Sequence, residues 1–189
     1  ARTYSDIFRN CFVDGNAALE EAKRDVMVQY RKGIIGKVFN ETALMGAKYT
    51  LGEDIPKDVL RKQILKNMAV LYGLEAISFM ASFACTFALC ETGRYQGIGK
   101  RVSLICADEI LHAEGDRRIF DTMFKYEGYD KEYDHIRDEV QVLFDTIVEQ
   151  ELKWAEYVFS DGRKALGLNT DLLKEYVYHI SKPVFDYMQ

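Results

Sequence analysis

Hydrophobic and polar residues follow one another along this chain at helical spacing. In the longest apolar stretches, apolar residues recur every three or four positions, and no segment alternates strictly as a half-buried strand does. The pattern predicts an all-α protein, most simply a bundle of antiparallel helices. The helices are expected at residues 2–13, 17–48, 56–92, 98–125, 131–159 and, after Asn169 or Thr170 as a cap, 170–182.

Glycine and proline mark the expected interruptions. Gly33, Gly36 and Gly46 weaken the second helix, where we expect a kink or a break. Pro56 suits the first residue of the third helix, because the backbone nitrogen at that position needs no hydrogen bond. Pro183 is expected to end the last helix, since a proline inside a helix removes a backbone hydrogen bond.

One stretch, residues 68–90, is long and apolar enough to span a bilayer: MAVLYGLEAISFMASFACTFALC. It contains a single charged residue, Glu75, which would be costly in lipid. No second stretch of this kind occurs in the sequence. We therefore interpret the segment as the central helix of a soluble bundle, buried on all sides, and expect no membrane association.

The composition is that of one ordinary globular domain over residues 1–189. Hydrophobic residues make up 48% and charged residues 29% of the chain, which excludes a disordered or fibrous protein. The net charge of −5 and the lack of a Lys/Arg-rich run argue against a nucleic-acid partner. Four cysteines without a Cys-x-x-Cys pair, and a polar opening segment, indicate a cytoplasmic rather than a secreted protein.

Three chemically active side chains lie on the predicted core faces of the two central helices. Glu75 falls within the apolar stripe of the third helix. Glu109 and His112 lie three residues apart on the apolar face of the fourth helix, so that both point in one direction. A buried carboxylate without a partner is costly or takes up a proton. Two carboxylates and an imidazole that face one core therefore call for a common partner, and a metal ion satisfies all three.

These residues match one half of a known type of metal site. Di-iron carboxylate sites in ferritin-like bundles combine Glu-x-x-His motifs with further glutamates from neighbouring helices. Hard carboxylate ligands with a single imidazole favour Fe or Mn over Zn. The sequence therefore predicts a ferritin-like helical bundle with a di-iron centre, manganese being the alternative, and one half of the ligands in this chain.

Each of these residues also has a simpler interpretation. A Glu-x-x-His motif occurs by chance on helix surfaces, and a buried glutamate can be purely structural. A second formal motif, Glu132–His135, lies in the polar stretch KEYDHIRDE, and we interpret it as a coincidence at a solvated helix start. His179 is interpreted as a surface or packing residue. The metal hypothesis is favoured because a buried glutamate and a Glu-x-x-His motif coincide on adjacent long helices.

The sequence around these residues resembles a known family. The segment LEAISFMASFACTFALCE, followed by ICADEILHAEG, is similar to the small, radical-generating subunit of class I ribonucleotide reductase. Further matching stretches are ARTYSDIFRN at the start and EQELKWAEYVFSDG beginning at Glu149. Together these stretches extend the resemblance over nearly the whole chain.

The resemblance implies a role for several residues. Glu75 would be a bridging or terminal carboxylate of one metal, Glu109 a metal-bridging carboxylate and His112 a terminal ligand of the same metal. Asp108 would be a carboxylate behind the ligands on the route of proton-coupled electron transfer. Three apolar residues would wall the pocket of a radical-bearing tyrosine: Phe79, Phe83 and Ile105.

The resemblance also implies an activity and partners. In that family the di-metal centre reacts with dioxygen and oxidises a nearby tyrosine to a radical, which a large subunit uses to reduce ribonucleotides to deoxyribonucleotides. One Asp, a second Glu-x-x-His and the radical tyrosine of the family have no match in this chain. We therefore expect a C-terminal portion of the subunit, completed by a partner N-terminal chain. The pair is expected to dimerise and to act with the large subunit.

The residues alone leave two other functions open. One is another ferritin-like di-iron oxidase or iron-storage protein that works as a homo-oligomer, which would need a second ligand set within this chain. The other is a non-catalytic helical interaction module with vestigial ligands, which would bind no metal.

Overall fold

A computed structural model describes residues 6–7, 9–10 and 12–188, and these residues form the all-α, ferritin-like fold that the sequence predicted. Among the described residues, β-type pairing is limited to one isolated bridge between Ala165 and Leu168, in the loop before the last helix. Residues 6–7 and 9–10 are helical, as expected there, whereas Cys11 and the other residues of the opening segment lie outside the described residues. The elements are α2 (Gly15–Arg24), α3 (Val26–Thr50), α4 (Lys57–Gly73), the π-helical turn η1 (Leu74–Ser78), α5 (Phe79–Cys90), α6 (Gln96–Glu127), α7 (Asp130–Val158), the 3-10 turn η2 (Ser160–Gly162) and α8 (Thr170–Met188).

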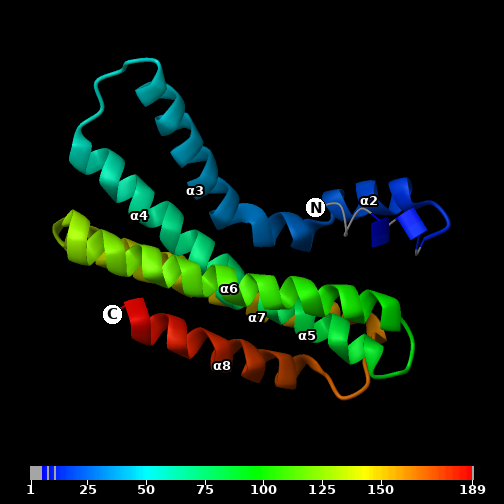
Figure 1. The fold of residues 1–189 in the computed structure, drawn as a ribbon. Helices are drawn as coiled ribbons and strands as arrows, with labels where there is room; N and C mark the ends of the chain where they lie inside the picture. Colours follow the sequence, from blue (N-terminus) through cyan, green and yellow to red (C-terminus); the bar gives the residue numbers. More distant parts are fainter. Residues whose placement is uncertain (1–5, 8, 11, 189) are drawn as a thin grey trace.

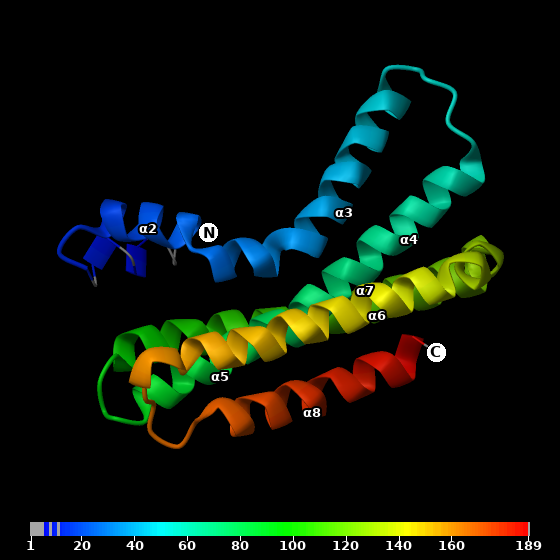
Figure 2. The same ribbon diagram turned by 180° about the vertical axis from the view of Figure 1, so that it is seen from behind.

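Four helices form the body of the molecule. Figures 1 and 2 show α5, α6, α7 and α8 running alongside one another, whereas α3 and α4 form a hairpin that rises away from them. The helix α7 is central, because it packs against α8, α4 and α3 as well as against η1. The turn η1 also contacts α6 and α8. It therefore lies where the hairpin joins the body of the bundle.

The segment predicted as a single second helix is two helices. Asp25, with φ −58° and ψ 128°, separates α2 from α3. Its side chain accepts hydrogen bonds of 2.9 and 3.0 Å from two backbone N–H groups in the first turn of α3, and so caps that helix. Gly33, Gly36 and Gly46 all lie inside α3. The break itself falls earlier than these glycines, because a capping aspartate interrupts the helix, whereas α3 bends along its length without a break (Figures 1 and 2).

The last helix begins where predicted but ends later. The Asn169 side chain accepts a hydrogen bond of 2.9 Å from the Leu172 N–H and caps α8. The helix then continues through Pro183, which the sequence predicted as its end. A proline costs one helical hydrogen bond. Val177 and Val184, on either side of it, are both buried in the core, and this packing holds the helix together across the proline.

The long apolar stretch forms the core of the fold as three consecutive elements, α4, η1 and α5. From Lys57 to Cys90 it is long and apolar enough to cross a membrane, and 56% of its most apolar window is buried inside the fold. Leu65 and Ile77 from this stretch, Phe120 from α6 and Phe144 from α7 are completely or almost completely buried. Such burial is typical of the core helix of a soluble protein.

A candidate metal centre between α6 and the π-turn

The helix α6 carries two of the three predicted ligands. Glu109 and His112 lie one turn apart, and His112 Nδ1 is 2.9 Å from Glu109 Oε2. Val102 and Phe120, on the same side of α6, are buried, so this side of the helix faces the interior. The Glu109 side chain is 15% exposed and the His112 side chain 57% exposed. The pair therefore lies at the edge of the core, with the imidazole reaching toward solvent.

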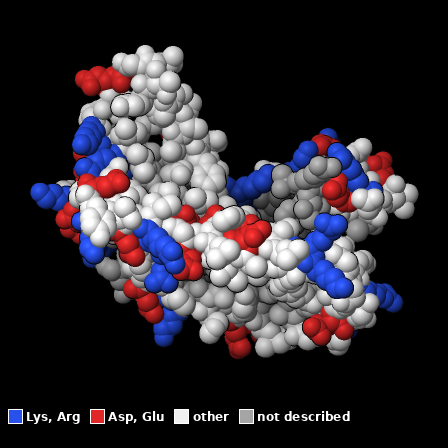
Figure 3. Space-filling model, viewed as in Figure 1, with Lys and Arg blue, Asp and Glu red and all other residues white. Residues whose placement is uncertain are grey.

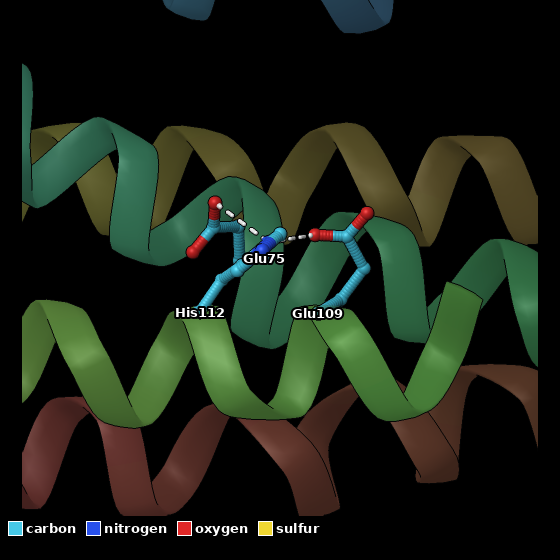
Figure 4. Close-up of side chains that lie close together, drawn as sticks. All are labelled: Glu75, Glu109 and His112. Carbon is cyan, nitrogen blue, oxygen red and sulfur yellow. Dashed lines mark hydrogen bonds and ion pairs between the residues drawn. The ribbon is translucent and has the colours of Figure 1, made fainter. Parts of the chain in front are cut away.

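Glu75 comes from η1 and faces the α6 pair. Its Oε1 lies 3.8 Å from His112 Nδ1, and one potential ligand atom from each of the three residues lies within 4.8 Å of the others. Figure 4 shows the imidazole lying between the two carboxylates, with Glu75 reaching in from the neighbouring helix. The fold thus brings together the three side chains that the sequence singled out as ligands.

The chemistry of this cluster fits a cation. Burial raises the pKa of Glu75, and a hydrogen bond to Asp116 raises it further. Glu75 Oε2 is buried and has no hydrogen-bond partner. The hydrogen bond to Glu109 raises the pKa of His112. A carboxylate-rich set with one imidazole and an orphaned buried oxygen suits a divalent Fe or Mn ion, whose charge would compensate the clustered acids.

Asp116 is an acidic residue at this cluster that the sequence reasoning missed. It is only 6% exposed, its carboxyl group helps to raise the pKa of Glu75, and burial raises its own pKa. Its Oδ2 is buried without a partner. The signal was present in the spacing, because Asp116 lies two helical turns after Glu109 and therefore on the same face of α6.

The residues implied as the radical-pocket wall lie partly in the core. Phe83 is 3% exposed, and the Phe79 and Phe83 ring centroids are 6.2 Å apart. Phe79 and Ile105 are half-buried. Asp108 is exposed on α6, and its negative charge helps to raise the pKa of His112. The roles of these four residues stay predictions.

The remaining histidines lie apart from the cluster. Glu132 forms an ion pair with Arg61 at 3.3 Å, whereas His135 is exposed and its Nδ1 lies 2.6 Å from a backbone carbonyl oxygen one turn earlier. His179 is exposed on α8. Among the described residues, the three ligand candidates are the one group whose atoms could converge on a metal ion. The second Glu-x-x-His motif thus behaves as a coincidence of spacing.

The surface over α6 carries apolar as well as charged side chains. In Figure 3 acidic side chains lie near the middle of the face that α6 crosses, with uncharged surface around them and Lys and Arg mainly toward the edges. Several large apolar side chains of α6 are exposed: Leu104, Ile110, Leu111 and Ile119. Soluble proteins rarely leave contiguous apolar surface uncovered unless it meets another molecule.

Known proteins share both the sequence and the fold of this chain. The family described as "Ribonucleotide reductase, small chain" matches residues 1–185. The ribonucleoside-diphosphate reductase subunit beta of Haemophilus influenzae is 31% identical, and subunit 1 beta of Escherichia coli O157:H7 is 30% identical, each over 96% of this chain. The ribonucleotide reductase R2 subunit from Clostridium botulinum superposes on the whole chain with a TM-score of 0.78 at 20% identity, which shows a common fold.

The chain spans about half the length of these relatives: 52% of the two curated proteins and 55% of the solved chain. The family match itself covers this chain from residue 1 to residue 185. The resemblance found in the motifs around Glu75 and Glu109 is confirmed, and the chain belongs to the ribonucleotide reductase small-chain family.

Proposed function

We propose that this chain is the C-terminal portion of a ribonucleotide reductase small subunit and supplies half of the ligands of its di-metal centre. The observation that carries the proposal is the convergence of Glu75, Glu109 and His112, with ligand atoms within 4.8 Å of one another, in a chain of this family. When bound, a di-iron or di-manganese centre supplies the dioxygen chemistry that oxidises a tyrosine to a radical, for use by a large subunit that reduces ribonucleotides.

The residues of this chain have separate tasks in that proposal. Glu75, Glu109 and His112 would hold the metal, and the two carboxylates would compensate its charge. His112 offers a neutral imidazole once its proton has left. Glu75, whose pKa is raised without metal, must also release its proton on binding. Asp116, buried next to Glu75, would help to orient the Glu75 carboxyl group.

The apolar wall and the exposed carboxylate next to the ligands have different proposed roles. Phe79, Phe83 and Ile105 would form the apolar wall of the radical-tyrosine pocket and would exclude water from that side of the site. Asp108 is proposed to lie on the route by which an electron and a proton travel. Its exposure on α6 is compatible with a contact to a group outside this chain.

We further propose that a partner N-terminal chain supplies the remaining ligands, namely an Asp, a second Glu-x-x-His and the radical tyrosine. The exposed imidazole of His112 and the exposed apolar side chains of α6 support a partner on this side. Dimerisation of the pair and docking on the large subunit follow from the family. The described cysteines, Cys85, Cys90 and Cys106, are free thiols, which supports a cytoplasmic location.

The test is the metal content of the protein purified from its native source with any chains that accompany it. We expect a partner chain, Fe or Mn in the complex, and loss of that metal in Glu109→Ala and in His112→Ala. His135→Ala is the matched control, because His135 belongs to the chance motif and is exposed; it should keep the metal. Elemental analysis also decides between Fe and Mn.

Three results would contradict the proposal in distinct ways. Metal and radical signal that survive both ligand substitutions would show that the ligands are assigned wrongly. Stoichiometric metal in the isolated chain would favour a self-sufficient di-iron oxidase or iron-storage protein. A wild-type complex without metal would favour an interaction module with vestigial ligands.

A further inference from the structure

The ligand Glu75 lies on a local distortion of the core helix. In η1 the Phe79 N–H bonds to the Leu74 carbonyl, five residues back, instead of the usual four. A π-turn has poorer geometry than an α-helix, and it persists only where the surrounding structure supports it. The position of the Glu75 carboxylate therefore depends on whatever holds this turn in place.

The turn is held at its beginning by close packing. Gly73, the residue before η1, approaches α7 so closely that a Cβ atom there would lie 2.7 Å from Ile147 Cδ1 and 3.2 Å from Phe144 Cε1. Both of these side chains are at most 1% exposed. The contact sets the distance between the core helix and α7, but an apolar contact does not hold the Ser78 carbonyl group in one direction.

The turn is held at its end by hydrogen bonds from outside the helix. Arg31 of α3 donates from Nη2 to the carbonyl oxygen of Ser78, the last residue of η1, at 3.0 Å, and to Ser82 Oγ at 2.9 Å. The same guanidinium donates to both oxygens of Glu151 of α7, at 3.0 and 2.7 Å. The Ser78 carbonyl group and the Ser82 hydroxyl group are thus bound by a guanidinium that Glu151 holds.

This ion pair is largely buried. The Glu151 side chain is 1% exposed and the Arg31 side chain 19% exposed, and the guanidinium carbon lies 4.4 Å from the centroid of the Trp154 ring. Buried ion pairs add little stability over an apolar pair of the same size, because desolvation offsets the attraction. A planar, forked donor does, however, define direction better than an apolar contact.

We propose that Arg31, held by Glu151, is a positioning residue for the metal ligand Glu75, and that it acts by fixing Ser78 at the end of the π-turn. The proposal rests on the proposed function in one respect, namely that Glu75 binds metal. Arg31 reaches the ligand through the helix backbone, one turn away, and makes no contact with the metal site itself.

The test replaces both partners at once by apolar residues of similar volume, Arg31→Met with Glu151→Leu. This double variant leaves no buried charge unpaired, so the fold is expected to persist, but the Ser78 carbonyl oxygen loses the donor that reaches it from α3. The control is Lys66→Met with Glu139→Leu. It removes a different ion pair, between α4 and α7, in which Lys66 Nζ lies 3.1 Å from Glu139 Oε2. Both are compared with the wild-type full chain, purified with its accompanying chains.

Two quantities are measured: the dissociation constant for Mn²⁺, from the EPR signal of the free ion, and the urea midpoint of the metal-free protein. We expect the first double variant to bind Mn²⁺ about tenfold or more weakly, as found for partners that orient metal ligands, at an unchanged urea midpoint. The control should keep the wild-type dissociation constant. A purely structural role would lower the midpoint of the metal-free protein and leave the affinity of the folded protein unchanged.

A dissociation constant within twofold of wild type in the folded double variant would overturn the inference and leave the proposed function standing. A wild-type protein that binds neither Mn²⁺ nor Fe²⁺ would overturn both, and one that binds Fe²⁺ alone is compared with the variants by its Fe²⁺ affinity. If the double variant does not fold, Arg31→Lys decides, because it keeps the charge beside Glu151 but loses the fork that reaches Ser78. Its affinity should fall at least threefold, and a wild-type affinity would overturn the inference.

Discussion

Replacing Gly73 by alanine places one methyl group where the core helix meets α7. The ideal Cβ atom would lie 2.7 Å from Ile147 Cδ1 and 3.2 Å from Phe144 Cε1, distances well inside van der Waals contact. Ile147 is 0% and Phe144 1% exposed, so neither side chain has free space to move into. The strain must be relieved by a shift of the helices or of buried side chains.

Two opposing effects determine the size of the change in stability. Overpacking a close-packed core costs about 1–3 kcal/mol. Alanine in a helix is favoured over glycine by about 1 kcal/mol. Because both neighbours are fully enclosed, we take the upper part of the overpacking range and expect Gly73→Ala to lower the free energy of unfolding by about 1–2 kcal/mol.

Urea unfolding of the metal-free chain, followed by far-ultraviolet circular dichroism, measures this change. Gly46→Ala in α3 is the matched control, since no atom lies within 4 Å of its Cβ position, and it should stabilise the protein by about 0.5–1 kcal/mol. Ile147→Val removes the closest atom. The double variant Gly73→Ala with Ile147→Val should therefore be more stable than the sum of the two single changes predicts.

The reasoning would be refuted if Gly73→Ala were as stable as Gly46→Ala, or if the two changes at the contact were additive. Additivity would mean that the core relaxes around the methyl group without involving Ile147. A stable variant with normal packing would show that the close approach of α7 is not what demands glycine at this position.

Three further predictions concern single side chains. The hydrogen bond from Tyr157 lowers the pKa of Asp25. Asp25 therefore stabilises the fold above its ordinary pKa of 3.8, and this contribution disappears as the pH falls below that value. In acid titrations of stability, the difference between wild type and Asp25→Asn should shrink over the same pH range. Burial raises the pKa of Glu75 from 4.5, so the metal-free protein should lose stability as the pH rises above 4.5. Glu75→Gln should flatten this pH dependence in unfolding experiments, and an unchanged slope would contradict the burial argument. The buried Tyr133 hydroxyl donates to the Met188 carbonyl oxygen, so Tyr133→Phe should cost about 1 kcal/mol and speed amide exchange at the end of α8, and unchanged exchange would count against this anchor.

Local signals in the sequence predicted much of the fold. Helical spacing located the long helices, Asn169 caps α8 as expected, and Gly128 ends α6 with φ 63°. The break between α2 and α3 falls at Asp25, because its side chain binds backbone N–H groups of the first turn of α3. The sequence prediction considered only the glycines as breakers of this helix. The end of α8 was misplaced because buried neighbours of Pro183 outweigh the hydrogen bond that the proline removes.

The candidate site likewise contains residues that local spacing predicts and residues that only the fold brings together. Glu109 and His112 share a face because of spacing within one helix, and the same rule would have found Asp116. The buried ion pair of Arg31 and Glu151 joins residues 120 positions apart, and no local pattern announces that pairing. Only Glu151 could have been noticed in the sequence, because it is an acidic residue within the apolar face of α7.

The sequence by itself therefore determined the helical class, the family and the candidate ligands, because helix periodicity, capping and motifs are properties of neighbouring residues. The tertiary structure decided how the ligands meet. Glu75 reaches the α6 pair from a π-turn, and that turn is held by Gly73 against α7 and by Arg31 from α3. A distortion of this kind depends on contacts between distant segments, and these exist only once the chain has folded.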